Sequence, residues 1–349
     1  MKSRTLDGKA IYGYIYRRSY AEAKRAQMEA RAAGVIVRKG TGCALPKSLE
    51  TYLTAWLQSV QTSIKKSTFS NYSGLIYRHI LPELGSFPVE QITSELIQKY
   101  VDRRLEAGRL DGKGGLSVKT VKDIVGLLKH SLKPVGVTLQ IHLPRYSPPK
   151  LKILTMEDQA RLVTAAKASG SREGIGVLLS LFTGIRIGEL CALKWCDIDF
   201  QKGILRIWHT LQRIESWDAG NSKTVIDIGT PKSDCSMRDI PIPSFLLAII
   251  SEQKSDDKED DYILSGCGCC VEPRCCQYRF KKLLQSTGIN VNFHALRHTF
   301  ATRCVELGVD AKTLSDILGH ANVNITLNRY VHPNFEHRKE CMEKLSIAF

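Results

Sequence analysis

The chain has 349 residues, of which 50 are Lys or Arg and 35 are Asp or Glu, giving a formal net charge of +15. This length favours two or three domains, and the charge fits either a polyanionic partner or a basic but inert surface. The longest apolar run, near residues 175–185, is too short to cross a bilayer, and a polar segment follows Met1, so we expect a soluble intracellular protein without membrane segments.

The N-terminal end predicts one strand and one helix. In residues 11–16 tyrosines alternate with isoleucines, which is a strand pattern. Ser19 and Glu22 form a capping box ahead of a basic, alanine-rich helix that runs to Gly34. One strand and one helix cannot bury a core of their own.

Residues 46–142 are predicted to form a four-helix domain, because four apolar stripes recur at helical spacing. The stripes are Tyr52, Leu53, Trp56, Leu57 and Val60; Tyr72, Leu75, Ile76, His79 and Ile80; Leu96, Ile97, Tyr100, Val101 and Leu105; and Val118, Val121, Ile124, Val125 and Leu128. Basic residues lie between these stripes: Lys65, Lys66, Arg78, Lys119, Lys122 and Lys129. They form either a solvated surface or a binding face.

A proline-rich basic connector, residues 143–151, separates this domain from a second one over residues 152–349. Thr155 and Asp158 form a capping box for a helix to about Ala168. A long apolar helix then ends at Gly184, and the next begins near Ile187. Arg186 therefore lies at a break between helices, beside free backbone N–H groups.

Beyond Trp195 the apolar period changes to two. Residues 203–210, 224–229 and 237–242 are predicted strands, with residues 231–233 at one of the turns. The acidic run 256–261 is expected to be a solvated loop, and a helix follows over residues 278–284. The second domain is thus predicted to be mostly helical with a small antiparallel sheet.

The cysteines do not suggest a disulfide framework, because their number is 11 and the chain has no secretory features. Five of them are clustered: Cys267, Cys269, Cys270, Cys275 and Cys276. The spacing of Cys267 and Cys270 suits half of a zinc knuckle. Adjacent cysteines are poor partners for one tetrahedral ion, so we prefer a cluster without metal.

Residues 293–330 predict three short helices that present polar groups at their ends. In the first helix Leu296, Phe300, Cys304 and Leu307 share one face, and Gly308 ends it. Asp310 caps the second helix and Gly319 closes it, while the third carries Tyr330. The polar groups are those of His294, Arg297, His320 and Tyr330.

A zinc metalloprotease was the alternative for His294 and His298, which stand four residues apart. It fails because Ala295 occupies the position where that mechanism needs a glutamate. A guanidinium and imidazoles suit phosphate binding, and the phenol of Tyr330 suits nucleophilic attack.

The order of these motifs resembles the tyrosine recombinases, the phage and transposon integrases. The resemblance rests on the motif HALR, which begins at His294, on LGH, which ends at His320, and on a tyrosine ten residues later. Upstream, TGIRIGEL at 183–190 resembles the first arginine box of that family, and TPKS at 230–233 resembles its hairpin lysine. The specific motifs cover roughly the last 200 residues, and the helix pattern extends the resemblance by about a hundred more.

The resemblance implies a mainly α fold with a small antiparallel β-sheet, divided into a helical core-DNA-binding domain (46–142) and a catalytic domain with the DNA breaking-rejoining fold (152–349). Residues 1–45 resemble part of an arm-binding domain whose preceding strands are missing. In such a protein the six basic residues between the stripes face DNA, which we prefer because the excess charge must lie somewhere. The last helix of the family commonly packs into a neighbouring protomer, and residues 335–345 have the apolar spacing for it.

The resemblance also assigns roles to individual residues. Tyr330 is the nucleophile that forms a 3′-phosphotyrosyl link, a reaction that needs neither ATP nor metal and hence no cofactor. Arg186 and Arg297 bind the phosphate, and His320 donates a hydrogen bond to it. Lys232 protonates the leaving 5′-oxygen and His294 assists the phenol. Glu189 orients these groups.

The expected function is therefore that of a site-specific recombinase, the integrase of a phage or mobile element in the cytoplasm of a bacterial cell, acting at the nucleoid. Its expected partners are double-stranded attachment sites, three further copies of itself in a tetramer, and an accessory bending or excision-directing protein. Two alternatives stay open: a type IB topoisomerase, and a DNA-binding relative without activity.

Overall fold

The computed structural model describes residues 2–4, 10–12, 48–147, 151–218, 221–231, 234–254, 257–330 and 342–343. The chain divides into two compact units, one of residues 1–60 with 75–143 and one of residues 61–74 with 144–349. Each unit is described by itself. In the described part of the chain no helix is both long and apolar enough to span a membrane.

The N-terminal end holds one more strand than the sequence analysis expected. Strand β1 (Lys2–Arg4) pairs antiparallel with β2 (Ala10–Tyr12), with Ser3 opposite Ile11. The expectation that no strand precedes β2 was wrong, because a three-residue polar strand carries no apolar alternation to detect. The rest of the expected strand and the helix to Gly34 lie outside the described residues.

The four helical segments predicted for residues 46–142 are present. They are α2 (Leu49–Val60); α3 (Lys66–Leu75) continued by a π-helix (Ile76–Ile80) and α4 (Leu81–Leu84); α5 (Ser94–Ala107); and α6 (Val118–Leu132). Two 3₁₀ turns, Val89–Gln91 and Lys133–Val135, complete them. Their buried faces follow the predicted stripes, with Leu53, Ile80, Ile97 and Leu128 fully buried.

Side chains of α5 bind the π-helix of the first unit. The His79 carbonyl lies within this π-helix. That oxygen accepts hydrogen bonds from the Tyr100 hydroxyl at 2.8 Å and from Arg104 Nη2 at 3.0 Å. The irregular turn is thus fixed to α5 by side chains.

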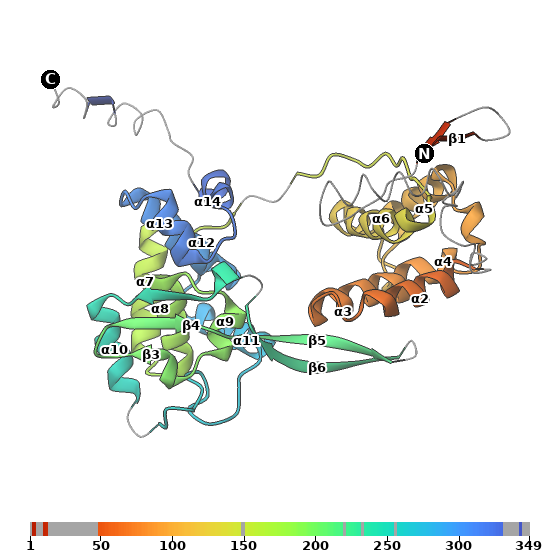
Figure 1. Ribbon diagram of the computed structural model, residues 1–349. Coiled ribbons are helices and arrows are strands. Elements are labelled where there is room, and N and C mark those ends of the chain that lie inside the picture. Colours follow the sequence, from red (N-terminus) through yellow and green to blue (C-terminus); the bar gives the residue numbers. More distant parts are fainter. Residues whose placement is uncertain are drawn as a thin grey trace, which may run out of the picture. The chain divides into compact units, whose positions relative to one another are not determined.

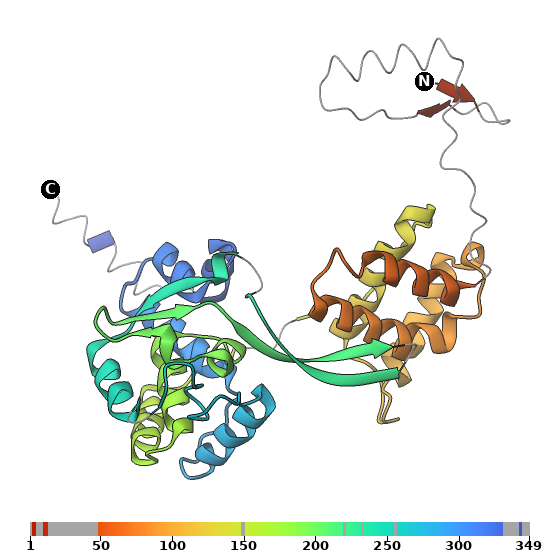
Figure 2. The same ribbon diagram turned by 60° about the horizontal axis from the view of Figure 1, so that its bottom comes forward.

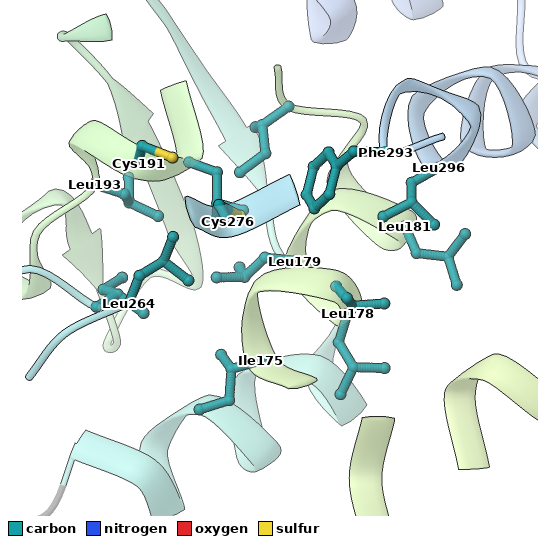
Figure 3. Packing of buried hydrophobic residues seen from close by; sticks show 14 of the residues in the cluster. Ile175, Leu178, Leu179, Leu181, Cys191, Leu193, Leu264, Cys276, Phe293 and Leu296 are labelled. Atoms are coloured by element: carbon teal, nitrogen blue, oxygen red, sulfur yellow. The ribbon is translucent and has the colours of Figure 1, made fainter. Parts of the chain in front are cut away.

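The second unit is built around α8 (Arg172–Thr183), nine of whose twelve residues are buried. Helices α7 (Met156–Ala168), α9 (Ile187–Ala192), α10 (Ser244–Lys254), α11 (Pro273–Gln285) and α12 (His294–Glu306) all contact it. Figure 3 shows Leu178, Leu179 and Leu181 of α8 among Leu264, Phe293 and Leu296. Helices α13 (Ala311–Leu318) and α14 (Val323–Tyr330) pack on α12 (Figure 1).

The expected single sheet is in fact two. Strands β3 (Ile198–Asp199), β4 (Ile204–Ile207) and β7 (Arg238–Pro241) form an antiparallel sheet in that order, while β5 (Thr210–Asp218) pairs only with β6 (Asn221–Gly229). Figure 2 shows β5 and β6 as a long two-stranded arm. The predicted strand 203–210 is interrupted at residues 208–209, where the chain leaves the first sheet.

One further expectation holds only in part and another was wrong. Residues 258–260 of the acidic run are exposed as expected, but Asp257 pairs with Arg172 at 2.5 Å and accepts a hydrogen bond from Trp195 Nε1 at 2.7 Å. Leu307 does not lie on the buried face of α12 but is 83% exposed, because the helix ends at Glu306. The predicted caps are present, with Thr155 accepting from the Asp158 N–H and Asp310 from the Thr313 N–H.

Candidate active site

Arg186 is held at the break between α8 and α9. Gly184 ends α8 in the left-handed region (φ 66°), and a Cβ there would lie 2.4 Å from the Phe300 ring, so only glycine fits. Arg186 Nη1 lies 2.7 Å from Glu189 Oε1, and its backbone N–H donates to Glu189 Oε2 at 2.9 Å. Its Nη2 donates to the Gly319 carbonyl at 2.9 Å, which places this half-buried guanidinium at the end of α13.

Arg297 lies deeper, in the first turn of α12. Its guanidinium donates to the Gly184 carbonyl at 2.7 Å and to the Leu318 carbonyl at 2.8 Å, so it joins the ends of α8 and α13. Burial, first, and the neighbouring Arg186 lower the pKa of Arg297 to about 9, which still leaves it cationic at neutral pH. Two guanidiniums thus converge on one place in the unit.

His320 follows the glycine that closes α13. Its Nε2 lies 3.0 Å from Arg297 Nη2, and its Nδ1 lies 2.8 Å from Thr326 Oγ1. A guanidinium only donates, so Nε2 accepts and the ring proton is on Nδ1. Burial, then Arg297 and Arg186, lower the pKa of His320 to about 4, so the ring is neutral. In this state Nε2 has no proton to give to a phosphate.

Tyr330 is the last residue of α14 and only 6% exposed. Its hydroxyl lies 2.8 Å from His298 Nδ1, and the charge of Arg297 acts on the phenol. Its ring is nearly parallel to that of His320, with 6.4 Å between centroids. Burial raises the pKa of this phenol, although Arg297 and Arg329 act in the opposite direction.

His294 and His298 stand one turn apart on α12, and their rings meet edge to face at 4.5 Å. The resemblance assigned assistance of the phenol to His294 and gave His298 no role. In the structure His294 is exposed, and the imidazole that contacts the Tyr330 hydroxyl is His298. The spacing of four residues places both rings on one helix face, but it does not show which of them meets Tyr330.

Glu189 is buried below the arginines and has a second partner that the sequence analysis missed. Arg238, at the start of β7, pairs with Glu189 Oε2 at 2.9 Å and donates to the Ile317 carbonyl at 2.5 Å. Gly319 is left-handed (φ 64°), and a Cβ there would lie 2.9 Å from Arg238 Nη1. Burial opposes ionisation of Glu189, but Arg238 and Arg186 outweigh it and hold its pKa below the usual range.

Replacing Arg238 with methionine should destabilise the protein by about 3 kcal/mol, because it leaves a buried carboxylate with one of its two cations removed. The side chains of Arg238 and Glu189 are 6% and 2% exposed, so water cannot substitute for the lost partner. Urea unfolding measures the change. Lys312→Met, which breaks an exposed pair with Asp316, is the matched control and should cost less than about 0.5 kcal/mol. Equal effects of the two substitutions would contradict this account of Glu189.

The free energy of unfolding should fall at mildly acidic pH, above the range in which carboxylates are protonated. Burial, then neighbouring His294, Arg329 and Arg297, lower the pKa of His298 to about 4. An unfolded histidine titrates near ~6.5, so the unfolded state binds more protons between these values. The free energy of unfolding should therefore fall as the pH drops from about 6.5 towards about 4, on the order of 3 kcal/mol for His298 alone.

Urea unfolding at about pH 7.5 and about pH 5 measures this loss. The His298→Asn variant is the control, because it has no group at that position to titrate and should show a smaller difference. An unfolding midpoint that is the same at both pH values would contradict the burial of neutral imidazoles.

Lys232 lies outside the described residues, between Pro231 and the 3₁₀ turn Asp234–Ser236. Of the six expected DNA-binding residues, Lys66 pairs with Asp227 of β6 at 3.2 Å, and Lys65 donates to the Pro231 carbonyl at 2.9 Å. Arg78 is half-buried in the π-helix. The other three, Lys119, Lys122 and Lys129, occupy exposed positions of α6, where Lys119 pairs with Asp123.

The cysteine cluster does not form a metal site in the part of the chain that the structure describes. Within that part, no group of three or more His, Cys, Asp or Glu side chains is placed to hold a metal ion. Cys276 is buried beside Cys191 of α9 (Figure 3), and the thiol hydrogen bond between them, together with burial, raises the pKa of Cys191. The zinc alternative has no support in these residues.

Residues 152–337 match the phage integrase family, and residues 48–104 match the phage integrase N-terminal SAM-like domain. A tyrosine recombinase XerC-like protein of Caldanaerobacter subterraneus subsp. tengcongensis is 30% identical over 376 residues, which cover 98% of this chain and 93% of that protein. The Tn1549 transposon integrase in complex with transposon right end DNA aligns at 22% identity with a TM-score of 0.64, over 84% of this chain and 99% of that one. A lambda integrase tetramer bound to a Holliday junction aligns at 20% identity with a TM-score of 0.56, over 96% and 94% of the two chains.

The fold is mostly helical with small antiparallel sheets. It brings together two arginines, two histidines and a buried tyrosine, and these features are those of a tyrosine recombinase. The chain belongs to the phage integrase family. The expected fold class is confirmed.

Proposed function

We propose that this protein is a site-specific DNA recombinase, an integrase, which cuts and rejoins DNA through a 3′-phosphotyrosyl intermediate at Tyr330. The observation that carries the proposal is that Arg297 is hydrogen-bonded to His320 and that the charges of Arg297 and Arg186 act on the Tyr330 phenol. A nucleophile and phosphate-binding cations are thereby held together. Membership of the phage integrase family supports the same reaction.

The two guanidiniums suit a phosphodiester whose charge grows as the phenol attacks. Each guanidinium has five N–H donors, so the bonds of Arg186 to Glu189 and Gly319 leave donors for a phosphate. Glu189 and Arg238 fix Arg186 in place before DNA arrives. A preorganised site of this kind has little reorganisation to do during the reaction.

The remaining roles are part of the proposal. Lys232 protonates the leaving 5′-oxygen as general acid. His320 donates to the phosphate once the negative charge of DNA favours its protonated form, and His294 lies at the exposed side of the site where DNA enters. The link conserves a phosphoester bond, so the reaction needs no ATP.

The proposed partner is a double-stranded attachment site of a phage or mobile element. A core-binding domain (46–142) and a catalytic domain (152–349), joined by residues 143–151, would each contact this DNA. Residues 1–45 would form part of an arm-binding domain. The Tn1549 integrase complex with transposon DNA supports DNA binding, and the lambda integrase tetramer on a Holliday junction supports a multimer on DNA. We propose a homotetramer. We also propose that an accessory protein bends the DNA or directs excision, and that the protein acts at the bacterial nucleoid.

Supercoiled plasmids test the function. The substrate carries the direct repeat that bounds the mobile segment around the gene, as two direct copies, two inverted copies or one copy. A recombinase excises a circle from the first, inverts the second and leaves the third unexchanged. A type IB topoisomerase relaxes all three alike, and a silent DNA-binding relative changes none, so either pattern would overturn the proposal. The comparisons give these alternatives no support.

Deleting residues 340–349 should leave binding to a half-site within about threefold but remove cooperative assembly on a full site. The terminal helix is expected from the sequence, and apart from residues 342–343 this segment lies outside the described residues. A short helix is not stable alone, so its apolar face would dock, in a tetramer on a neighbour. Gel-shift titrations on half and full sites measure both effects. Unchanged cooperativity in the truncated protein would place the segment on its own subunit.

A further inference from the structure

His298 makes a contact that the resemblance to the family did not assign. It lies in α12, is 5% exposed, and its Nδ1 is 2.8 Å from the Tyr330 hydroxyl. The two rings are tilted by 49°, with centroids 5.7 Å apart, so the ring edge and not its face meets the hydroxyl. This is the geometry of a hydrogen bond between two buried side chains.

The proton of the Tyr330 phenol needs an acceptor. Arg297, which acts electrostatically on this phenol, can only donate and so cannot take the proton. Among the described contacts, His298 Nδ1 is the acceptor within hydrogen-bond distance of the hydroxyl. The pKa of His298 is lowered to about 4 by burial and then by His294, Arg329 and Arg297, so the ring is neutral at pH 7 and can accept.

The other two imidazoles of the site are not placed for this task. Both nitrogens of His320 are engaged, Nε2 with Arg297 and Nδ1 with Thr326. His294 contacts the ring of His298 instead of the phenol. Of these three imidazoles, His298 alone has a nitrogen within hydrogen-bond distance of the Tyr330 hydroxyl among the described contacts.

We propose that His298 is a catalytic residue, the general base that takes the proton of Tyr330 as the phenol attacks the scissile phosphate. The inference rests on the proposed function. In the forward step the Tyr330 O–H bond breaks and an Nδ1–H bond forms, while the phenol oxygen bonds phosphorus and the 5′-oxygen leaves with a proton from a separate acid. In resealing, a 5′-hydroxyl attacks phosphorus and the departing phenol recovers its proton from His298.

The surroundings explain when the base becomes effective. The charged and titratable groups facing His298 are His294 and Arg297 on α12, and Arg329 and Tyr330 on α14. The cations among them disfavour an imidazolium in the free protein. A bound phosphate adds negative charge beside them, so the protonated ring is stabilised only when substrate is present.

His298→Asn is the decisive variant, because the asparagine side chain keeps an acceptor near the position of Nδ1 but cannot hold the proton. The readout is the single-turnover rate of covalent attachment to a nicked suicide substrate. We expect the rate to fall by about 10²-fold or more while DNA binding is kept. His209→Asn, an exposed histidine of the same unit outside the site, is the matched control and should keep the wild-type rate.

A fluorinated tyrosine at position 330 shows whether His298 removes the proton of the phenol or only holds the phenol in position. Its phenol is more acidic and needs less help, so the defect of His298→Asn should shrink when both changes are combined. Attachment by His298→Asn at the wild-type rate would overturn the proposal, and so would a defect that the fluorinated phenol does not reduce. If the asparagine variant does not fold, His298→Gln is subjected to the same two measurements.

The pH profile gives an independent readout. Attachment by the wild-type protein should decline in acid as His298 in the DNA complex becomes protonated, and this decline should be absent in the variant. An identical acid limb in both proteins would overturn the assignment. If wild-type protein forms no adduct at any pH, the proposed recombinase function itself fails. If wild-type protein forms the adduct and His298→Asn forms it at the same rate, only the role of His298 fails.

Discussion

Tyr330→Phe abolishes covalent attachment to a nicked suicide substrate, because the substitution removes the only atom that joins the DNA. The affinity for DNA should stay within about threefold, since a single neutral hydrogen bond contributes on the order of 1 kcal/mol. The free protein should lose a similar amount of stability, because His298 Nδ1 is left buried without its partner. Denaturing gels measure attachment, and gel shifts measure affinity.

Tyr262→Phe is the matched control for this prediction. Tyr262 is buried in the same unit but lies outside the site, so its hydroxyl should be dispensable for attachment. Covalent protein in the Tyr330→Phe variant would mean that another side chain is the nucleophile.

Lys232→Ala should slow cleavage of ordinary DNA by about 10²- to 10⁴-fold, the range that a general acid contributes. The 5′-oxygen is a poor leaving group unless it is protonated. A substrate with sulfur at the 5′-bridging position has a leaving group that needs no proton, so it should restore the rate of the variant. Single-turnover cleavage of both substrates by both proteins measures this rescue.

The control for the lysine is Lys194→Ala, which removes a lysine elsewhere in the same unit and should leave both rates unchanged. A Lys232→Ala variant that stays slow on the sulfur substrate would assign the general acid to another residue. A variant with normal rates on ordinary DNA would remove Lys232 from the chemistry.

The sequence was sufficient where a residue is positioned by local structure. Gly184 and Gly319 end helices in the left-handed conformation, and Asp310 caps α13, so Arg186 and His320 were correctly expected at helix ends. These local rules placed Arg186 and His320 at helix ends, while the resemblance to the tyrosine recombinases joined them with Arg297 and Tyr330 in one expected site.

His298 and Arg238 could not be predicted in this way, because each makes its contact across the fold. His298 meets Tyr330 only through the packing of α12 on α14, and Arg238 reaches Glu189 from a strand that begins 49 residues later. Burial extends to five consecutive residues of α12, Ala295–Thr299, so the apolar stripe gave no reason to look at His298. Asp257 was misplaced for the same reason, since its partners Arg172 and Trp195 are distant in sequence.

The pairing of the strands is a second feature that the sequence pattern could not predict. A period of two indicated extended chain from Gly203 to Thr210 but not that β4 and β5 belong to different sheets. The choice of partner depends on which strands the rest of the chain delivers, here β7 for β4 and β6 for β5.

The measurement that tests the central claim most directly is the chemical identification of the protein–DNA link. Wild-type protein is reacted with a suicide substrate in buffer containing EDTA, the adduct is digested with nuclease and trypsin, and the modified peptide is sequenced by mass spectrometry. The account predicts a 3′-phosphonucleotide on Tyr330, in the peptide from Tyr330 to Arg338 or in its extension to Thr313 if the bond after Arg329 is protected. An adduct on any other residue, a link to a 5′-phosphate, or an adduct that forms only without EDTA would contradict it.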